Sequence, residues 1–303
     1  MKVAVSGATG LVGSALAPRL TSQGHDVVPL VRRAPRPGES AIAWDPEAGT
    51  IDRSGLEGYD AVVHLAGENV FGRWTAAKKQ RIRDSRVKGT RLLSEALAGL
   101  ARRPRVLLAA SAIGYYGDRG AKELTEEGGP GDDFLAQVAR DWEAATAPAA
   151  QAGIRVVNLR FGVVLTPTGG ALAKMLPPFR VGLGGHVGSG KQFFSWIALD
   201  DALDAILHAL TVTSLAGPLN LTAPSPVTNR EFAKTLGRVL GRPAVVPVPA
   251  FALRIAFGAE GADMLLSGQR VLPARLLTSG FRFRYGELEA ALRHLLAAPL
   301  RGP

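Results

Sequence analysis

Three evenly spaced glycines follow a short apolar stretch at the start of the chain. Residues 2–5 predict a buried strand, and Gly7, Gly10 and Gly13 predict a tight turn into a helix that begins near Leu11. Glycine lets a backbone amide approach a bound group, and the N–H groups and dipole of a helix N-terminus attract a pyrophosphate. The spacing G-x-x-G-x-x-G differs from the G-x-G-x-x-G of the two-half dinucleotide fold. Close packing without a ligand is the alternative, and the place between strand and helix favours a cofactor.

The composition fits one large α/β unit with a smaller appended lobe. The chain has 303 residues and is 47% hydrophobic, which is enough for a large core. It has no cysteine, which excludes disulfides and thiolate chemistry, and we predict no metal site. No basic segment with a long apolar run precedes the first strand, and no apolar run approaches the roughly 18 residues of a membrane span. We therefore expect a soluble, cytoplasmic protein with no membrane partner.

The formal net charge is +10, from 36 Lys and Arg against 26 Asp and Glu. A solvated, arginine-rich surface explains most of this excess, and a field that attracts a phosphorylated dinucleotide is the functional alternative. The basic residues are scattered, and the aromatic residues, at 6% of the chain, do not interleave with them as stacking platforms would. We therefore expect no nucleic-acid partner.

Strands and helices alternate, which predicts a Rossmann-type, doubly wound parallel sheet of the α/β class. After the first strand, further strands are expected at 27–31, 41–44, 61–65, 106–110 and 155–159. Helices are expected at 11–22, 74–98 and 132–150 between them. Pro18 should kink or end the first helix, and Pro29 is awkward in the second strand. Ligands of such sheets bind at the carboxyl ends of the strands.

Arg32 and Arg33 close the second predicted strand. At this place an acidic residue holds a ribose 2′-hydroxyl, whereas arginine accommodates a 2′-phosphate. Arg32, with or without Arg33, therefore favours NADP(H) over NAD(H). A solvated basic loop that continues to Arg36 is the alternative. At the end of the fourth strand, His64 is expected to be a packed or hydrogen-bonded residue rather than a proton carrier.

The chain divides into an NADP-binding domain of residues 1–165 and a lid and substrate lobe of residues 166–303. Elements around 193–222 return to the first domain, and residues 193–197 predict a returning strand. Glycine and proline become frequent after the sixth strand, as at Gly169-Gly170. Such a segment is typical of a lid over a substrate.

Several motifs along the whole chain match one known family. They are Leu65-Ala66-Gly67-Glu68-Asn69, Arg73-Trp74-Thr75, Asp84-Ser85-Arg86-Val87, Asp133-Phe134-Leu135, Asp141-Trp142-Glu143, Leu159-Arg160-Phe161-Gly162-Val163-Val164-Leu165, Gly188-Ser189-Gly190, Ser195-Trp196-Ile197 and the run from Leu265 to Pro273. The chain resembles the atypical short-chain dehydrogenase/reductases called epimerase family proteins, and the last run resembles their C-terminal module. The glycine turn resembles the Thr-Gly-x-x-Gly-x-x-Gly of extended members, with Ser6 in place of the threonine.

The resemblance implies an NADP(H) cofactor and a small-molecule substrate, such as a sugar nucleotide or a carbonyl compound. It implies that the pyrophosphate lies on Gly10, Leu11 and Val12, with Val164 near the nicotinamide. The expected cofactor-binding residues are Gly7, Thr9, Gly10, Leu11, Val12, Gly13, Arg32, Arg33, Leu65, Ala66, Gly67, Glu68, Arg86, Ser111 and Val164. Helices of this fold often pair subunits, so a homodimer is one option.

The usual proton relay of the parent superfamily is missing. That superfamily has Tyr-x-x-x-Lys on the helix after the fifth strand, in which the tyrosine moves a proton and the lysine lowers its pKa. Here the two positions fall on Leu135 and Ala139, neither of which can move a proton. The atypical group shares this loss.

Three residues near the end of the fifth strand are the remaining catalytic candidates: Ser111, Tyr115 and Tyr116. Ser111 is equally explained as a hydrogen-bonding residue of the turn. Tyr116 with Gly117 matches a pair that shapes the substrate pocket of ordinary epimerases, which favours a binding role.

Two functions stay open at this point. The first is an NADP-dependent oxidoreductase or epimerase with a rearranged active site. The second is a non-catalytic, NADPH-binding sensor or regulatory protein. The missing proton relay favours the sensor, and a glycine-rich lid that can seal a pocket favours the enzyme, because hydride transfer needs water to be excluded.

Overall fold

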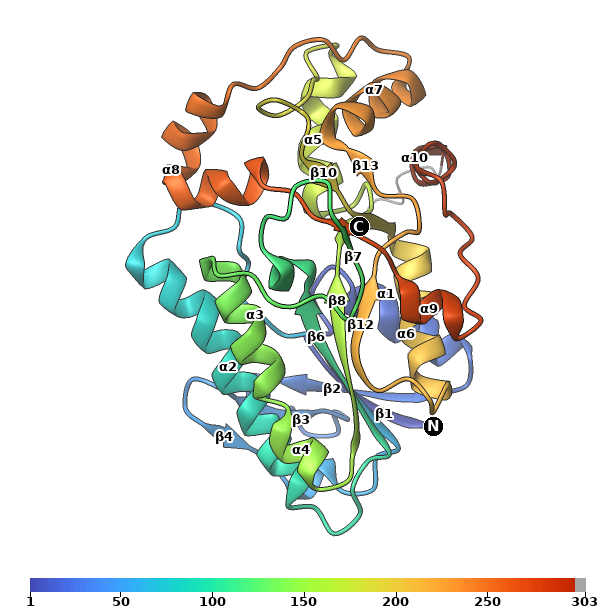
Figure 1. Cartoon of the computed structure of the whole chain (residues 1–303). Helices are drawn as coiled ribbons and strands as arrows, with labels where there is room; N and C mark the ends of the chain where they lie inside the picture. The colour runs from blue at the N-terminus through green and yellow to red at the C-terminus, as the bar shows by residue number, and fades with distance from the viewer. Residues whose placement is uncertain (298–303) are drawn as a thin grey trace.

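The computed structural model describes residues 1–297, and its centre is an eight-stranded sheet (Figure 1). The strands are β1 (Lys2–Ser6), β2 (Asp26–Val31), β3 (Ile42–Asp45), β4 (Thr50–Ile51), β5 (Ala61–His64), β6 (Val106–Ala112), β8 (Arg155–Phe161) and β12 (Gly217–Leu221). Their order is β12-β8-β6-β5-β1-β2-β3-β4, and every neighbouring pair is parallel except β3 with β4. The predicted doubly wound parallel sheet is confirmed, with one short antiparallel strand added at an edge.

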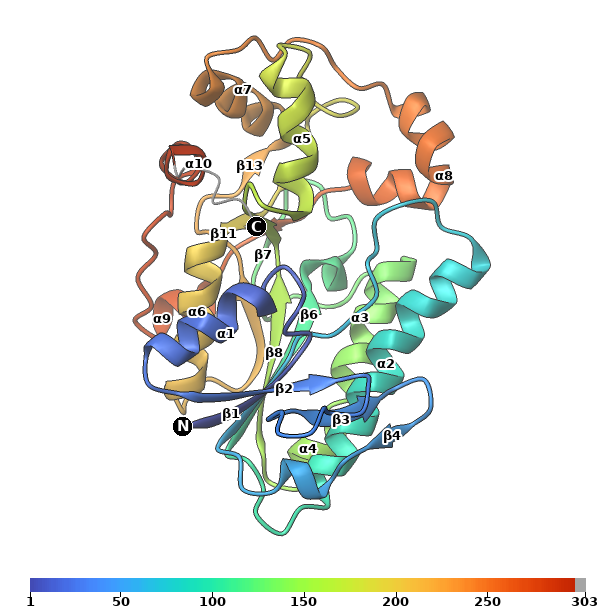
Figure 2. The ribbon, with the colours of Figure 1, turned by 180° about the vertical axis from the view of Figure 1, so that it is seen from behind.

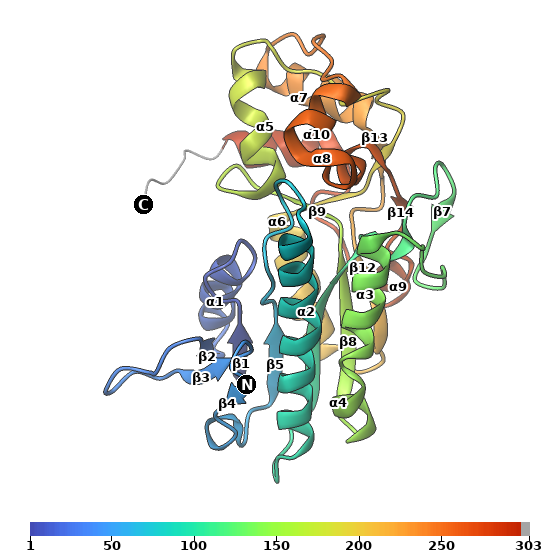
Figure 3. The ribbon, with the colours of Figure 1, turned by 90° about the vertical axis from the view of Figure 1, so that its left-hand side faces the viewer.

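Helices cover both faces of this sheet (Figures 1 and 3). The helices α1 (Gly13–Ser22) and α6 (Leu199–Thr211) lie on one face, and α2 (Ala76–Ala98), α3 (Phe134–Ala144) and α4 (Ala147–Gln151) lie on the other. Successive side chains of a strand point to opposite faces, so Val3 and Val5 pack on the α1 side while Ala4 packs on the α2 side. All three are fully buried, as expected of a strand that is covered on both faces.

A second, smaller lobe lies beyond the carboxyl ends of the parallel strands (Figure 2). Its helices are α5 (Gly170–Arg180), α7 (Asn229–Leu240), α8 (Ala250–Leu266) and α10 (Leu288–Ala297), and the short α9 (Ala274–Thr278) lies beside β12. Short strand pairs join the two parts: β9 (Val163–Leu165) with β11 (Trp196–Ala198), β10 (Phe193–Phe194) with β13 (Val227–Thr228), and β7 (Glu123–Leu124) with β14 (Arg270–Val271). Residues 298–303, the end of the predicted lobe, lie outside the described residues.

The structure corrects two predicted elements. The single helix expected over 132–150 is divided into α3 and α4, because Pro148 has no N–H to continue the ladder of α3. The single strand expected over 193–197 is divided at Ser195, whose hydroxyl donates to the carbonyl of Gln269 (2.6 Å) and accepts from the amide of Val271 (2.9 Å). The two halves therefore pair with different strands.

The two awkward prolines are both accommodated. Pro18 lies inside α1 without ending it. Pro18 has no N–H to donate to the carbonyl oxygen of Ser14, but both residues are exposed, so water can bond this oxygen instead. Pro29 pairs with Val5 of β1, and the neighbouring β3 pairs with β2 only from Leu30 onward. The missing N–H of Pro29 therefore leaves no gap in a ladder.

Among residues 1–297, none of the helices is both long enough and apolar enough to cross a membrane.

His64 links the sheet to the helices on its α2 side. Its Nδ1 lies 2.6 Å from the Ser6 hydroxyl, and its Nε2 lies 3.0 Å from the Thr90 hydroxyl, which also accepts from the indole N–H of Trp142 (2.8 Å). The ring is fully buried, and burial lowers its pKa to about 4. The prediction that His64 is a packed, hydrogen-bonded residue is confirmed.

Replacement of His64 by Gln should flatten the pH dependence of stability between about pH 6.5 and pH 4. The unfolded histidine takes up a proton near pH 6.5 but the folded one only near pH 4, so the wild-type protein loses stability as the pH falls through this window. The shift corresponds to about 3 kcal/mol. Urea unfolding of both proteins at several pH values measures the difference, and equal losses in both would show that the buried ring is not kept neutral.

Candidate functional site

The glycine turn brings the end of β1 against the end of β5. Gly7 has a φ of +69°, and a Cβ there would lie 2.8 Å from both the Ala66 nitrogen and the Leu65 carbonyl carbon. A Cβ at Gly13 would collide with the carbonyl oxygen of Gly7, to which the Gly10 amide donates (2.9 Å). The turn therefore keeps its shape only with glycine at both positions.

Free backbone donors lie at the crest of this turn. Helix α1 begins at Gly13, two residues later than predicted, and its N-terminus has no side-chain cap. Within the described residues, the amides of Leu11 and Val12 donate to no backbone or side-chain acceptor. Thr9 and Gly10 are exposed beside them. Two unused N–H groups at the positive end of a helix form a suitable place for a phosphate.

The lobe contacts the turn through the side chain of Leu11. A Cβ at Gly169 would lie 2.6 Å from Leu11 Cδ1, and one at Gly170 would lie 3.0 Å from Leu11 Cδ2. The carbonyl oxygen of Val164 lies 3.7 Å from the point where a Cβ of Gly170 would stand. The structure therefore brings Leu11 and Val164, two predicted cofactor residues, together beneath the start of α5.

Arg32 and Arg33 follow β2, and the structure distinguishes between them. The Arg33 guanidinium forms two bonds to the Glu39 carboxylate (2.7 and 2.6 Å), and these bonds hold the pKa of Glu39 at about 2. Arg32 is exposed and forms no ion pair within the described part of the chain. Arg32 is therefore available to an incoming anion, whereas Arg33 already has a partner.

Arg86 lies against the loop that follows β5. Its Nη1 donates to the carbonyl oxygen of Glu68 (2.9 Å), and its Cζ is 3.4 Å from the point where a Cβ of Gly67 would stand. The Glu68 carboxylate turns instead to Lys78 (2.6 Å). Burial lowers the pKa of Arg86 to about 10. Among residues 1–297 the guanidinium has no ion-pair partner, and its Nη1 also donates to the carbonyl oxygen of Ile82 (3.1 Å).

A buried ion pair lies behind the end of β6. Arg160 bonds both oxygens of Glu143 (2.7 and 2.8 Å), and only 3% and 12% of the two side chains are exposed. The Glu143 carboxylate also accepts from the Ser111 hydroxyl (2.6 Å). The Arg160 guanidinium donates to the Tyr116 hydroxyl (2.9 Å), which donates to Asn220 (2.7 Å). The pair with Glu143 raises the pKa of Arg160, so this cation stays charged at any working pH.

This arrangement separates the three predicted catalytic residues. Ser111 and Tyr116 are buried, and their hydroxyls are used within the ion-pair network. The Tyr115 side chain is half-buried, its ring lies 3.5 Å from the Arg160 guanidinium, and its hydroxyl forms no hydrogen bond within the described residues. The Ser111 and Tyr116 hydroxyls therefore have internal partners, whereas the Tyr115 hydroxyl has none among residues 1–297.

Helix α3 lies where the parent superfamily carries its proton relay. Leu135 and Ala139 occupy the two positions, and the Leu135 Cβ is 3.5 Å from the point where a Cβ of Gly114 would stand. Ala139 is almost fully buried. The helix is therefore in place beside the end of β6, and the proton-carrying groups are absent from these two positions. Across residues 1–297, no group of three or more His, Cys, Asp or Glu residues is placed to hold a metal ion.

Sequence reasoning missed the buried contacts of Arg160 and Asn220. Their partners lie between 17 and 104 residues away in the chain, which no local pattern indicates. One signal was available: Arg160 stands inside the apolar run Leu159 to Leu165. A charged residue in a strand buried on both faces requires a buried partner.

Replacement of Arg160 by Met should lower the free energy of unfolding by about 3–5 kcal/mol, because it leaves the Glu143 carboxylate buried without its partner. Adding Glu143→Leu to that variant should recover part of the loss. The control is Lys88→Met, which breaks a solvent-exposed pair with Asp84 and should cost less than about 1 kcal/mol. Denaturant unfolding measures the free energy of unfolding of all three variants. Similar losses for Arg160→Met and Lys88→Met would show that Glu143 does not depend on Arg160 as a buried partner.

Comparisons with known proteins identify the family of this chain. Residues 3–220 match the NAD dependent epimerase/dehydratase family, and residues 248–295 match a domain of unknown function, DUF1731. An epimerase family protein of Mycobacterium tuberculosis is 45% identical over 98% of both chains. The crystal structure of human epimerase family protein SDR39U1 (isoform 2) with NADPH is 39% identical, has a TM-score of 0.91, and covers 98% of this chain and 99% of its own.

The crystal structure of a nucleoside-diphosphate sugar epimerase from Corynebacterium glutamicum is 41% identical, with a TM-score of 0.79. It covers 98% of this chain, which spans 58% of that longer protein. The resemblance read from the motifs is confirmed by these matches, including the separate C-terminal module. By its fold, its sequence and its glycine turn, this chain belongs to the NAD dependent epimerase/dehydratase family, among the epimerase family proteins of the atypical short-chain dehydrogenase/reductase type.

Proposed function

We propose that this chain binds NADP(H) at the glycine turn, and that it transfers hydride between the nicotinamide and a small substrate. The observation that carries the proposal is a set of polar groups along one edge of the sheet. The Leu11 and Val12 amides have no acceptor among residues 1–297, Arg32 is exposed, and the half-buried Arg86 guanidinium has no ion-pair partner among the same residues. A polyanionic dinucleotide is the ligand that such a row of donors suits.

Each of these groups has a distinct part of the cofactor to hold. The amides of Leu11 and Val12 would bind the pyrophosphate, with Gly7, Gly10 and Gly13 shaping the turn. Arg32 would bind the 2′-phosphate, and Arg33 contributes less because Glu39 already holds it. Leu65, Ala66, Gly67 and Glu68 would line the ribose beside Arg86, and Thr9, Ser111 and Val164 complete the predicted set. The bound NADP(H) supplies the hydride acceptor or donor.

The human relative supports this choice of cofactor, because its crystal structure carries NADPH and its fold covers almost the whole of this chain. A preference for the phosphorylated cofactor in this chain rests on Arg32. The substrate class that we propose is a carbonyl compound or a sugar nucleotide, with Tyr115 as the group that exchanges a proton with it. A cytoplasmic location and a homodimer stay predictions of the sequence.

A non-catalytic NADPH sensor is the second candidate function, and one observation favours it. Leu135 and Ala139 stand where the parent superfamily has its tyrosine and lysine, so this helix cannot carry out the usual proton transfer. The enzyme is favoured by the position of Tyr115 over a fixed cation and by the contact of the lid with Leu11. These features position a proton donor and limit access of water, which a sensor does not need.

Replacement of Arg32 by Ala should weaken NADPH binding roughly 10- to 100-fold and leave NADH binding unchanged, because only NADPH carries the 2′-phosphate. Calorimetric titration of both cofactors measures the two affinities. Arg91→Ala is the matched control, because Arg91 is an exposed arginine of α2 whose nearest acid is Glu95 at 3.9 Å. An equal loss for NADPH and NADH, or no loss for either, would remove Arg32 from the cofactor site.

Replacement of Tyr115 by Phe should lower NADPH oxidation by roughly 100-fold or more and leave NADPH affinity within about twofold. Absorbance at the nicotinamide band, with a panel of aldehydes, ketones and sugar nucleotides, measures turnover. Tyr285→Phe is the control, since the Tyr285 ring stacks on His294 in the other lobe. No turnover by the wild-type protein with any member, together with tight NADPH binding, would favour the sensor.

A further inference from the structure

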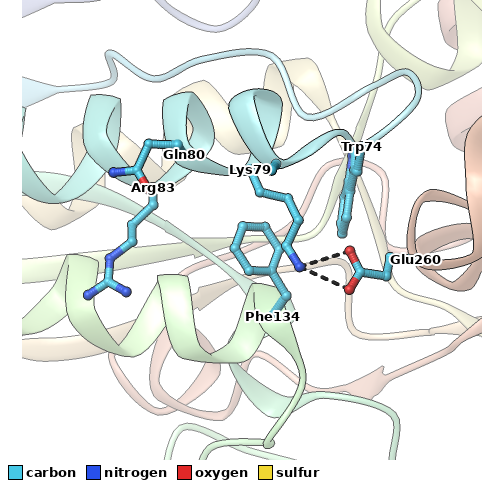
Figure 4. A pocket seen from close by; sticks show the side chains of 7 residues that line it. Trp74, Lys79, Gln80, Arg83, Phe134 and Glu260 are labelled. Atoms are coloured by element: carbon cyan, nitrogen blue, oxygen red, sulfur yellow. Dashed lines mark hydrogen bonds and ion pairs between the residues drawn. The ribbon is translucent and has the colours of Figure 1, made fainter.

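A pocket of about 480 Å³ lies where helices α2, α3 and α8 meet. Its lining side chains include Trp74, Lys79, Gln80, Arg83, Phe134 and Glu260 (Figure 4). None of its lining residues is among the predicted cofactor-binding residues, although two of them are close in sequence to the predicted site. Trp74 ends the loop that begins at Leu65, and Phe134 stands directly before Leu135.

One side of the pocket is aromatic. The rings of Trp74 and Phe134 meet edge to face, with centroids 5.5 Å apart and an angle of 66°. The indole N–H of Trp74 donates to the carbonyl oxygen of Val70 (2.7 Å), which fixes the orientation of the ring. Such a wall suits a flat, unsaturated group, which packs well on aromatic faces and edges.

The same pocket holds a lysine whose partner comes from the other lobe. The Lys79 ammonium lies 2.9 Å from the Glu260 carboxylate and 4.5 Å from the centroid of the Phe134 ring. The Lys79 side chain is 29% exposed and that of Glu260 is 53% exposed. Because Glu260 is the more solvated partner, it can leave Lys79 for water at little cost.

The second cation of the pocket, Arg83, is paired with an acid of α3. Arg83 lies one helical turn after Lys79 on α2, and its guanidinium is 2.8 Å from Asp141 of α3. Glu260 is therefore the one carboxylate among the six side chains named above, against two cations. The Glu260 carboxylate already binds the Lys79 ammonium beside the Phe134 ring, and this ion pair is solvent-exposed rather than buried.

We propose that this pocket binds an aromatic carboxylate. The carboxylate of the ligand replaces that of Glu260 on Lys79, and its ring packs against Trp74 and Phe134. Arg83, one turn further along α2, is already paired with Asp141 and is not needed for this binding. The proposed ligand site shares no lining residue with the proposed cofactor site, so the two can be tested separately.

Replacing Lys79 and replacing Glu260 should change benzoate binding in opposite directions. Lys79→Met removes the group that binds the ligand, so it should weaken benzoate binding at least about fivefold. Glu260→Gln removes the competitor and keeps the size of the side chain, so it should strengthen benzoate binding about two- to fivefold. A pair with a purely structural role would shift binding in the same direction when it is broken from either side.

The experiment is an NMR titration of the full chain, saturated with NADPH, with benzoate and with its neutral analogue benzamide. We expect benzoate to bind more tightly than benzamide in the wild-type protein, and the two to become equal in Lys79→Met. Lys88→Met, which removes a cation of α2 outside the pocket, is the control. Thermal unfolding of every variant confirms that each is folded.

Benzoate that binds no better than benzamide, or the same sign of effect for both pair variants, would overturn the inference. NADPH binding by the same samples is measured separately by calorimetry. If benzoate binds no better than benzamide while NADPH still binds, only the proposed ligand pocket is refuted. Failure to bind NADPH with the benzoate effect intact refutes the proposed cofactor and leaves the pocket standing.

Discussion

The close approach of the Gly7 backbone to the backbone of Leu65 and Ala66 is the constraint on which the site depends. A side chain at residue 7 would have no room, because its first atom would stand 2.8 Å from two backbone atoms of β5's following loop. Directly beneath this contact, the Ser6 hydroxyl bonds His64, which ties the same two strand ends through their side chains. The open amides of α1 and the guanidinium of Arg86 are therefore held in fixed positions at one edge of the sheet.

A second fixed element stands where the parent superfamily places its chemistry. The buried Arg160–Glu143 pair costs a large desolvation energy, so its geometry must be well satisfied, and bonds to Ser111 and Tyr116 complete it. The result is a rigid cation under the ring of Tyr115.

The sequence was sufficient for the fold because the decisive features are local. The glycine turn, the apolar strands and the end-to-end motifs all lie within short segments, and they predicted the parallel sheet and the family correctly. Element ends were less well predicted: Pro148 divides the helix that was expected to be continuous over 132–150. The partners of Arg33 and Glu143 could not be predicted, since Arg33 has an equally basic neighbour and Glu143 meets an arginine 17 residues later. Such choices depend on packing in three dimensions, which residue spacing does not record.

The central claim is that the turn at Gly7 and the charge at Arg32 together hold a phosphorylated dinucleotide. Isothermal titration calorimetry of the folded wild-type chain with NADPH and with NADH tests it most directly. The account predicts one binding site with a clear preference for NADPH. Absence of heat with both cofactors, in protein that unfolds cooperatively, would contradict it.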